Sequence, residues 1–346
     1  MSGEAEGTVE SDATRAVAAE DAFGPTDALQ TLTTWVLFVA TVLAGVALAE
    51  PVATAGLGLA VDSSSVGSLR HLLVPFAGGL VVFFLLQRYD YGRVALQAAF
   101  LGYLAFMFGR VLIGAGVATA PLAFLPPLAV VVVLWRHPEW YVVNLVGVAF
   151  GAVIAAILGT SYGPLPALVA LVGWAAYDAY AVYRSDAMET IAAAGLEMSI
   201  PGAFFVPDRL DASLREYRLS FEDDEATDGD TSDETDGPAT DTTTADGDET
   251  DGPDFKILGV GDAMVPGFLV VSATWFLDAT PVVAGLNWPA LGALLGSLVG
   301  LAVLEVVVRR VGGAHAGLPA LNATTIGGYL LGALVAGVPL ATAVGV

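Results

Sequence analysis

The sequence predicts an all-α membrane protein with about nine transmembrane helices, and three observations lead to this class. Hydrophobic residues make up 55% of the 346 positions and charged residues only 14%, whereas charged residues are about 25% of an ordinary soluble domain. The mean hydropathy is +0.71. Nine apolar runs can each cross a bilayer, because about 20 helical residues cover a hydrocarbon core roughly 30 Å thick.

Six of these runs come before a long polar break and three come after it. They cover residues 29–49, 72–86, 94–118, 121–135, 141–158, 165–183, 257–276, 290–308 and 318–344. The third and fourth runs meet at Thr119-Ala120-Pro121, so eight spans are an alternative.

The net charge is −23, and the acidic residues gather outside the apolar runs. Residues 1–27 lack the apolar stretch of a secretory signal peptide and are expected to form a disordered cytoplasmic tail. Transmembrane helices 1–6 are expected in residues 28–184, a cytoplasmic loop in 185–256 and transmembrane helices 7–9 in 257–346. Within the loop, residues 222–254 are dominated by Asp, Glu, Thr and Gly, a composition that cannot bury enough apolar surface to fold.

The first part of the loop is less polar. Residues 185–198 have the spacing of a short amphipathic helix. Residues 200–207, which lie between two prolines, are expected to be extended.

Composition also disfavours several kinds of chemistry. There is no cysteine, and the three histidines are scattered, so we expect neither a metal site nor a cofactor. An acidic chain repels phosphates, which argues against nucleic-acid binding. Acidic, solvated segments suit a cytoplasm at very high salt, where repulsion is screened over a few ångströms. This composition favours a halophilic archaeal source.

The distribution of Lys and Arg predicts the orientation. With nine spans, nearly all basic residues outside the helices fall on one side, and Arg70 alone falls in an opposite loop. The positive-inside rule then places the N-terminus and the acidic loop in the cytoplasm and the C-terminus outside. Arg110, inside the third span, is expected to play a structural role.

Two aspartates within the apolar runs are the candidate functional residues, because a charge in a membrane helix costs several kcal/mol and is rarely kept without a use. Asp178 lies six residues before Arg184, and Asp262 lies six residues after Lys256. If both intervals are helical, the carboxyl groups lie about 9 Å from the cytoplasmic boundary and at the same depth. Two adjacent carboxyl groups share one proton. One can then activate water while the other polarises a carbonyl, as in aspartic proteases.

Three further features surround this pair. Gly259 and Gly261 are expected to let the seventh span approach its neighbour closely and to loosen the helix before Asp262. Pro319 frees a backbone carbonyl near the start of the ninth span, where irregular backbone is tolerated if it lines a cavity.

Together these motifs resemble the presenilin and signal peptide peptidase family. The resemblance rests on Tyr177-Asp178 in the sixth span, Gly259-Val260-Gly261-Asp262 in the seventh and Pro319-Ala320-Leu321 at the ninth. It implies an intramembrane aspartyl endopeptidase that cleaves transmembrane segments of other membrane proteins, with Asp178 and Asp262 as the catalytic pair. It also implies that Tyr177, Gly259, Gly261, Pro319, Ala320 and Leu321 shape the active site or contact substrate.

Two other functions remain open from the sequence. A prepilin or preflagellin type of peptidase shares the Gly-x-Gly-Asp chemistry but has fewer spans. A transporter or cation pathway could use the two membrane aspartates as an ion site. Residues 200–207 are a candidate strand for pairing with an unwound substrate. Glu305 is expected to pair with Arg309 one helical turn away, and Asp278 is expected at a solvated outer end.

Overall fold

A computed structural model of the chain describes residues 25–59, 61–87, 92–184, 201–215, 217, 255–311 and 316–346. The predicted tail up to residue 24, the amphipathic helix at 185–198 and the acidic insert at 222–254 lie outside the described residues. The predicted domain boundaries at residues 27 and 184 stay predictions.

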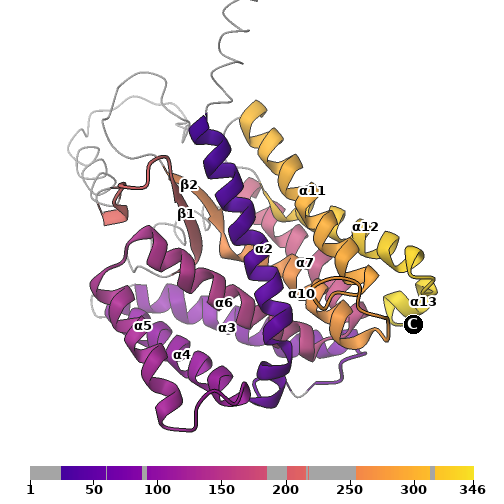
Figure 1. Cartoon of the computed structure of the whole chain (residues 1–346), viewed down its shortest axis with the longest axis horizontal. Coiled ribbons are helices and arrows are strands. Elements are labelled where there is room, and N and C mark those ends of the chain that lie inside the picture. The colour runs from indigo at the N-terminus through magenta and orange to yellow at the C-terminus, as the bar shows by residue number, and fades with distance from the viewer. Residues whose placement is uncertain are drawn as a thin grey trace, which may run out of the picture.

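The described residues are mostly helical, which confirms the predicted fold class (Figure 1). The helices are α2 (Pro25–Thr54), α3 (Arg70–Gln87), α4 (Gly92–Gly114), α5 (Leu125–Arg136), α6 (Trp140–Ser161), α7 (Pro164–Arg184), α10 (Val260–Phe276), α11 (Trp288–Val311), α12 (Leu318–Val335) and α13 (Leu340–Val344). Two 3₁₀ turns, η1 (Val66–Leu69) and η2 (Leu122–Phe124), precede α3 and α5. In this part of the chain, six helices are long and apolar enough to cross a membrane. Three shorter apolar helices, at 66–82, 122–136 and 260–276, accompany them.

The third and fourth predicted runs form separate helices. Helix α4 ends at Gly114, and Gly116 then adopts a left-handed conformation with φ of 69°. Ala115, Gly116 and Val117 donate backbone hydrogen bonds to carbonyls of the last turn. This glycine-dependent helix end separates the two runs, as the nine-span prediction requires.

The ninth predicted run is broken rather than continuous. Helix α12 ends at Val335, and α13 starts only at Leu340. Between them Gly337 has a φ of 68°, which glycine adopts without steric cost. Pro339 follows as the N-cap of α13 and has no N–H to donate to a continuing helix.

Helices α6 and α10 form the centre of the bundle, and α2, α7 and α11 also pack against α10 (Figure 1). Phe268, Leu269 and Val270 of α10 are completely buried. A Cβ atom on Gly159 of α6 would overlap the side chain of Val271, so glycine is required at this contact between α6 and α10.

A two-stranded antiparallel sheet lies at the end of the molecule where α2 begins and α11 ends (Figure 1). Its strands are β1 (Ala203–Pro207) and β2 (Phe255–Gly259), with Phe205 opposite Ile257. The prediction of an extended segment is therefore confirmed for 203–207. The prediction that the seventh span begins at residue 257 is wrong, because residues 255–259 form a strand and α10 begins at Val260.

Candidate functional site

Asp178 lies on the buried face of α7, with a residue exposure of 7%. Its Oδ2 atom accepts a hydrogen bond of 3.0 Å from the backbone N–H of Leu318, the first residue of α12. The free N–H groups at a helix start are natural partners for a carboxylate. The start of α12 therefore holds the Asp178 carboxyl group in a defined orientation.

Asp262 lies in the first turn of α10, three residues after the N-cap Gly259. Its carboxyl group folds back and accepts a hydrogen bond from the backbone N–H of Gly259, the arrangement of the acidic residue in a capping box. A Cβ atom on Gly259 would lie 3.2 Å from Asp262 Oδ2. Glycine at this position leaves room for the carboxylate, which is a different role from the predicted helix–helix approach.

The segment before α12 brings the two aspartates together. A Cβ atom on Gly317 would lie 3.8 Å from Asp262 Oδ1, while the next residue, Leu318, donates to Asp178. The two carboxyl groups are close enough for their charges to act on each other. Three elements far apart in sequence, α7, α10 and the start of α12, therefore converge on one site.

Gly317 and Leu318 were not among the predicted site residues. Their contribution is a backbone N–H and a missing side chain, neither of which produces a recognisable side-chain pattern. The signal that could have found them is the Gly-Leu-Pro sequence itself, since proline in the first turn marks a helix start with its free N–H groups directly before it.

The prediction that a helical interval separates each aspartate from its neighbouring basic residue is wrong for Asp262. Lys256 lies in β2 and α10 begins only at Val260, so most of the interval between Lys256 and Asp262 is not helical. The interval from Asp178 to Arg184 is helical as predicted, because α7 runs to Arg184. Both aspartates lie beside the start of α12, a tertiary contact that counting residues from the basic side chains does not reveal.

The remaining predicted site residues differ in how far their side chains are buried. Tyr177 is 42% exposed, and its ring contacts Phe76 of α3 edge-to-face with 6.3 Å between centroids. Pro319 and Ala320 are partly buried in the first turn of α12. Leu321 is completely buried in the core, so its side chain supports α12 from inside and is not available to a substrate.

Gly261 does not serve the predicted close approach to a neighbouring helix. A Cβ atom at this position would meet no atom within 4 Å. The space beside Gly261 is open, next to the turn that carries Asp262.

Other charged groups in the apolar segments have structural partners. Arg110 donates to the carbonyl of Ala55, directly after α2, in keeping with the predicted structural role. Glu305 is bonded to Lys256 of β2 at 2.5 Å, a partner that was not predicted. Asp278 follows α10 and is exposed. In the described ranges, no group of three or more His, Cys, Asp or Glu side chains is arranged to hold a metal.

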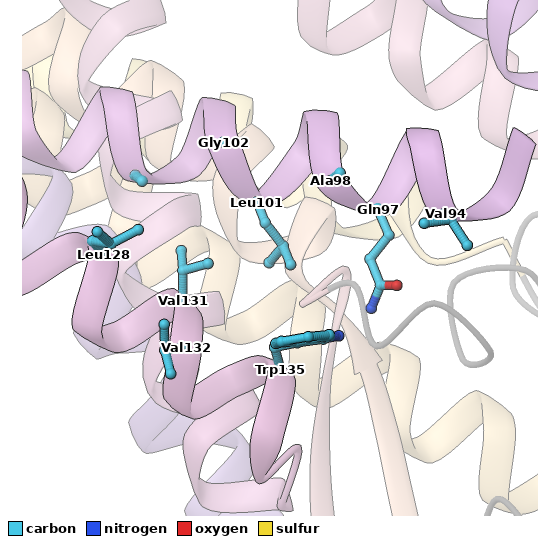
Figure 2. A pocket seen from close by; sticks show the side chains of 10 residues that line it. Val94, Gln97, Ala98, Leu101, Gly102, Leu128, Val131, Val132 and Trp135 are labelled. Carbon is cyan, nitrogen blue, oxygen red and sulfur yellow. The ribbon is translucent and has the colours of Figure 1, made fainter. Parts of the chain in front are cut away.

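An apolar groove between α4 and α5 is separate from the aspartates (Figure 2). Leu101, Leu128 and Val131 line it, and the Gln97 amide points towards the Trp135 ring at one end. No lining residue comes from α7, α10 or α12. The groove therefore plays no part in the candidate site.

The fold and the two carboxyl groups define a class: a polytopic helical membrane protein in which two acidic side chains lie beside the start of one helix, α12. The family described as signal-peptide peptidase, presenilin aspartyl protease matches residues 35–338. The chain belongs to this family. It is therefore a multi-pass membrane protein and an enzyme of the intramembrane aspartic protease class.

Two solved structures are similar to this chain. One is a presenilin family intramembrane aspartate protease in space group C222, with 28% sequence identity and a TM-score of 0.55, covering 87% of this chain and 98% of that chain. The other is a presenilin family intramembrane aspartate protease in space group P2, with 29% identity and a TM-score of 0.58, covering 88% and 98%. No curated protein matches the chain.

Proposed function

We propose that Asp178 and Asp262 are the catalytic pair of an endopeptidase that hydrolyses peptide bonds within transmembrane segments of other membrane proteins. The observation that carries this proposal is the approach of one short segment to both carboxyl groups. Leu318 N–H donates to Asp178 at 3.0 Å, and a Cβ on Gly317 would lie 3.8 Å from Asp262 Oδ1.

The proposed reaction uses the two carboxyl groups in opposite protonation states. Two adjacent carboxyl groups share one proton, because ionising both is costly where little water is present. The ionised group takes a proton from a water molecule, and the protonated group donates its proton to the carbonyl oxygen of the substrate. The water oxygen bonds to the carbonyl carbon. The carboxyl group that took the proton of water then passes it to the amide nitrogen, the C–N bond breaks, and the other carboxylate takes back a proton from one hydroxyl group of the intermediate. This chemistry needs no metal or cofactor.

Substrate binding is proposed at the outer edge of β2, not on β1. A helical substrate hides its peptide groups, so it must unwind before cleavage and then needs new partners for its backbone. In β1, the N–H of Phe205 already donates to Asn144, and its carbonyl oxygen accepts from Asn144. Ile257 of β2, opposite Phe205, has its backbone groups on the side away from β1. Addition of an extended substrate to this edge would place it beside Gly259 and Asp262.

The proposed orientation has the N-terminus and the 185–256 loop in the cytoplasm and the C-terminus outside. Lys256 and Arg309 both donate to Thr31 near the start of α2, so basic residues gather at the sheet end of the bundle. The positive-inside rule favours the cytoplasm for this end. We also propose a salt-rich archaeal cytoplasm, in keeping with the net charge of −23.

The test is cleavage of a single-span membrane substrate by the purified protein in lipid vesicles. Wild type is compared with Asp178→Asn and Asp262→Asn, and with Asp278→Asn as the matched control, since Asp278 follows α10 but is exposed. We expect wild type and the control to cut within the span, and we expect Asp178→Asn and Asp262→Asn to be inactive. The rate should fall at both ends of the pH range, because one carboxyl group must be protonated and the other ionised.

Each other outcome changes the conclusion. Cleavage that persists in either dyad variant would show that the two aspartates are not the catalytic pair. Processing only at the leader sequences of prepilins would favour the prepilin type of peptidase. An inert wild type that carries a cation flux dependent on Asp178 and Asp262 would favour the transport alternative.

A further inference from the structure

Asn144 is a polar residue in the second turn of α6, a largely apolar and buried helix. It lies on α6 and is only 4% exposed. Its Nδ2 donates to the carbonyl of Phe205 at 2.8 Å, and its Oδ1 accepts from the N–H of Phe205 at 2.8 Å. Both bonds go to the backbone of one residue, so they fix the position of β1 along α6 whatever side chain that strand carries.

The same face of α6 also packs against the start of α10. A Cβ atom on Gly147 would lie 3.2 Å from Phe204 of β1 and 3.2 Å from Val260. A Cβ atom on Gly151 would lie 2.9 Å from Val260. Residues three and seven positions after Asn144 lie close to its face of the helix. Asn144, Gly147 and Gly151 thus form a track, defined by these three residues, against which β1 and Val260 pack.

Short connections lead from this track to the aspartates. β1 pairs with β2, and the N–H of Val260 donates to Gly202, the residue before β1, at 2.9 Å. Gly259 ends β2 and holds the Asp262 carboxyl group through its N–H. A displacement of β1 along α6 therefore moves the free edge of β2 and the first turn of α10 relative to Asp178.

We propose that Asn144 is a positioning residue that sets which peptide bond of the substrate is cut. It holds β1 on α6 and so fixes where the edge of β2 lies relative to Asp178 and Asp262. This inference rests on the proposed function, because it needs the dyad to cut a strand added to β2. Since side chains of a strand alternate with a period of two, a loosened edge would accept the substrate most readily about two residues out of register.

The experiment measures the positions of the cuts rather than activity alone. Asn144→Leu has nearly the same shape but can neither donate nor accept. Asn287→Leu is the matched control, because Asn287 is 2% exposed and also makes two backbone hydrogen bonds, to Ala273 and from Ala290, but near the end of α10 that lies away from Asp262. Products of a single-span substrate are identified by mass spectrometry, and thermal unfolding is followed for each variant.

We expect both variants to lower the unfolding temperature, but only Asn144→Leu to change the products. The share of products from secondary cuts should rise several-fold in Asn144→Leu and stay at the wild-type level in Asn287→Leu. Wild-type cut positions in Asn144→Leu would overturn the proposal, as would an equal spread of cuts in Asn287→Leu.

A second variant keeps the proposal testable if Asn144→Leu does not fold. Gly147→Ala keeps both hydrogen bonds of Asn144 but presses on Phe204 and Val260, whereas a Cβ on Gly102 of α4 meets nothing within 4 Å. We expect a smaller rise in secondary cuts for Gly147→Ala than for Asn144→Leu and none for Gly102→Ala. Unchanged cut positions in Gly147→Ala would overturn the proposal.

The two proposals fail in distinguishable ways. If cleavage depends on Asp178 and Asp262 but the cut positions do not change in the Asn144 and Gly147 variants, the proposed catalytic pair is supported and only the positioning role is overturned. If cleavage does not depend on the aspartates, both proposals are overturned.

Discussion

At the residue scale, two glycines shape the candidate site because they have no side chain. Gly259 and Gly317 each leave space beside an Asp262 oxygen. The carboxyl group lies between two pieces of backbone that approach it from different elements. Such crowding holds a reactive group in place without additional side-chain partners.

Gly259→Ala should reduce activity far more than stability. Gly259 has φ of −60° and ψ of 134°, which alanine adopts without strain, but its Cβ would press on Asp262 Oδ2 at 3.2 Å. Small displacements of reacting groups cost up to about 100-fold in rate, so we expect kcat to fall roughly tenfold to a hundredfold. The free energy of unfolding should change by no more than about 1 kcal/mol.

The measurements for this variant are kcat on a single-span substrate and thermal unfolding in the same detergent. Gly102→Ala controls for adding a methyl group where nothing lies within 4 Å. A Gly259→Ala protein with wild-type kcat would mean that the carboxylate does not need this space during catalysis.

At the element scale, α11 and α12 pack closely through glycines. Gly292 and Gly296 of α11 face Thr324, Gly328 and Gly332 of α12, and a Cβ on either α11 glycine would overlap a backbone carbonyl oxygen of α12. Small residues spaced four apart permit this close approach in membranes. The packing holds α12, whose first residue donates to Asp178.

Gly296→Ala should therefore separate α11 from α12. Its Cβ would overlap the carbonyl oxygen of Thr324, a backbone atom that cannot rotate away. Overpacking of this kind costs about 1–3 kcal/mol, and we expect a lower unfolding temperature. Gly327→Ala is the matched control, because it adds a methyl group to α12 where nothing lies within 4 Å. Equal unfolding temperatures for the two variants would contradict the close packing.

The sequence predicted the helices better than it predicted the elements around the site. Apolar runs identify membrane helices because the requirement for length and hydrophobicity is severe. The run that starts at Ile257 predicts a helix, because the pattern of a short apolar segment does not distinguish a helix from a strand. The Phe255–Gly259 strand is fixed by its pairing with Ala203–Pro207, which lies far away in sequence.

Asn144 was not among the predicted site residues, although the sequence carries a signal for it. A side-chain amide in a membrane helix needs partners within the protein, so Asn144 is as unusual in an apolar segment as Asp178 and Asp262. What no pattern could supply is its partner, the backbone of Phe205, since backbone groups are the same at every position.

At the scale of the whole molecule, the charge is very unevenly distributed. The described residues hold as many basic as acidic side chains, ten of each, although the full chain carries a net charge of −23. The acidic excess therefore lies outside the described residues, mainly in the N-terminal segment and in residues 222–254. The folded bundle itself is close to neutral.

Replacing residues 222–254 by a short Gly-Ser linker should leave unfolding temperature and cleavage unchanged at high salt. The linker has little distance to cover, since the rings of Tyr217 and Phe255 lie 4.9 Å apart. The shortened chain should also lose less stability than wild type when salt is reduced, because self-repulsion of the acidic segment is then removed. Thermal unfolding at low and high KCl tests both statements. A shortened protein that folds but no longer cleaves would give the insert a role in catalysis.

The two hydrogen bonds between Asn144 and Phe205 have a consequence for inhibition. Because they occupy the outer edge of β1, the described part of the chain offers an incoming strand only the outer edge of β2. Recognition there depends on backbone groups that every peptide carries. Short extended peptides should therefore compete with all substrates alike, whatever their sequence. Their potency should depend on how well their conformation is fixed before binding, since a rigid strand loses less entropy when it docks.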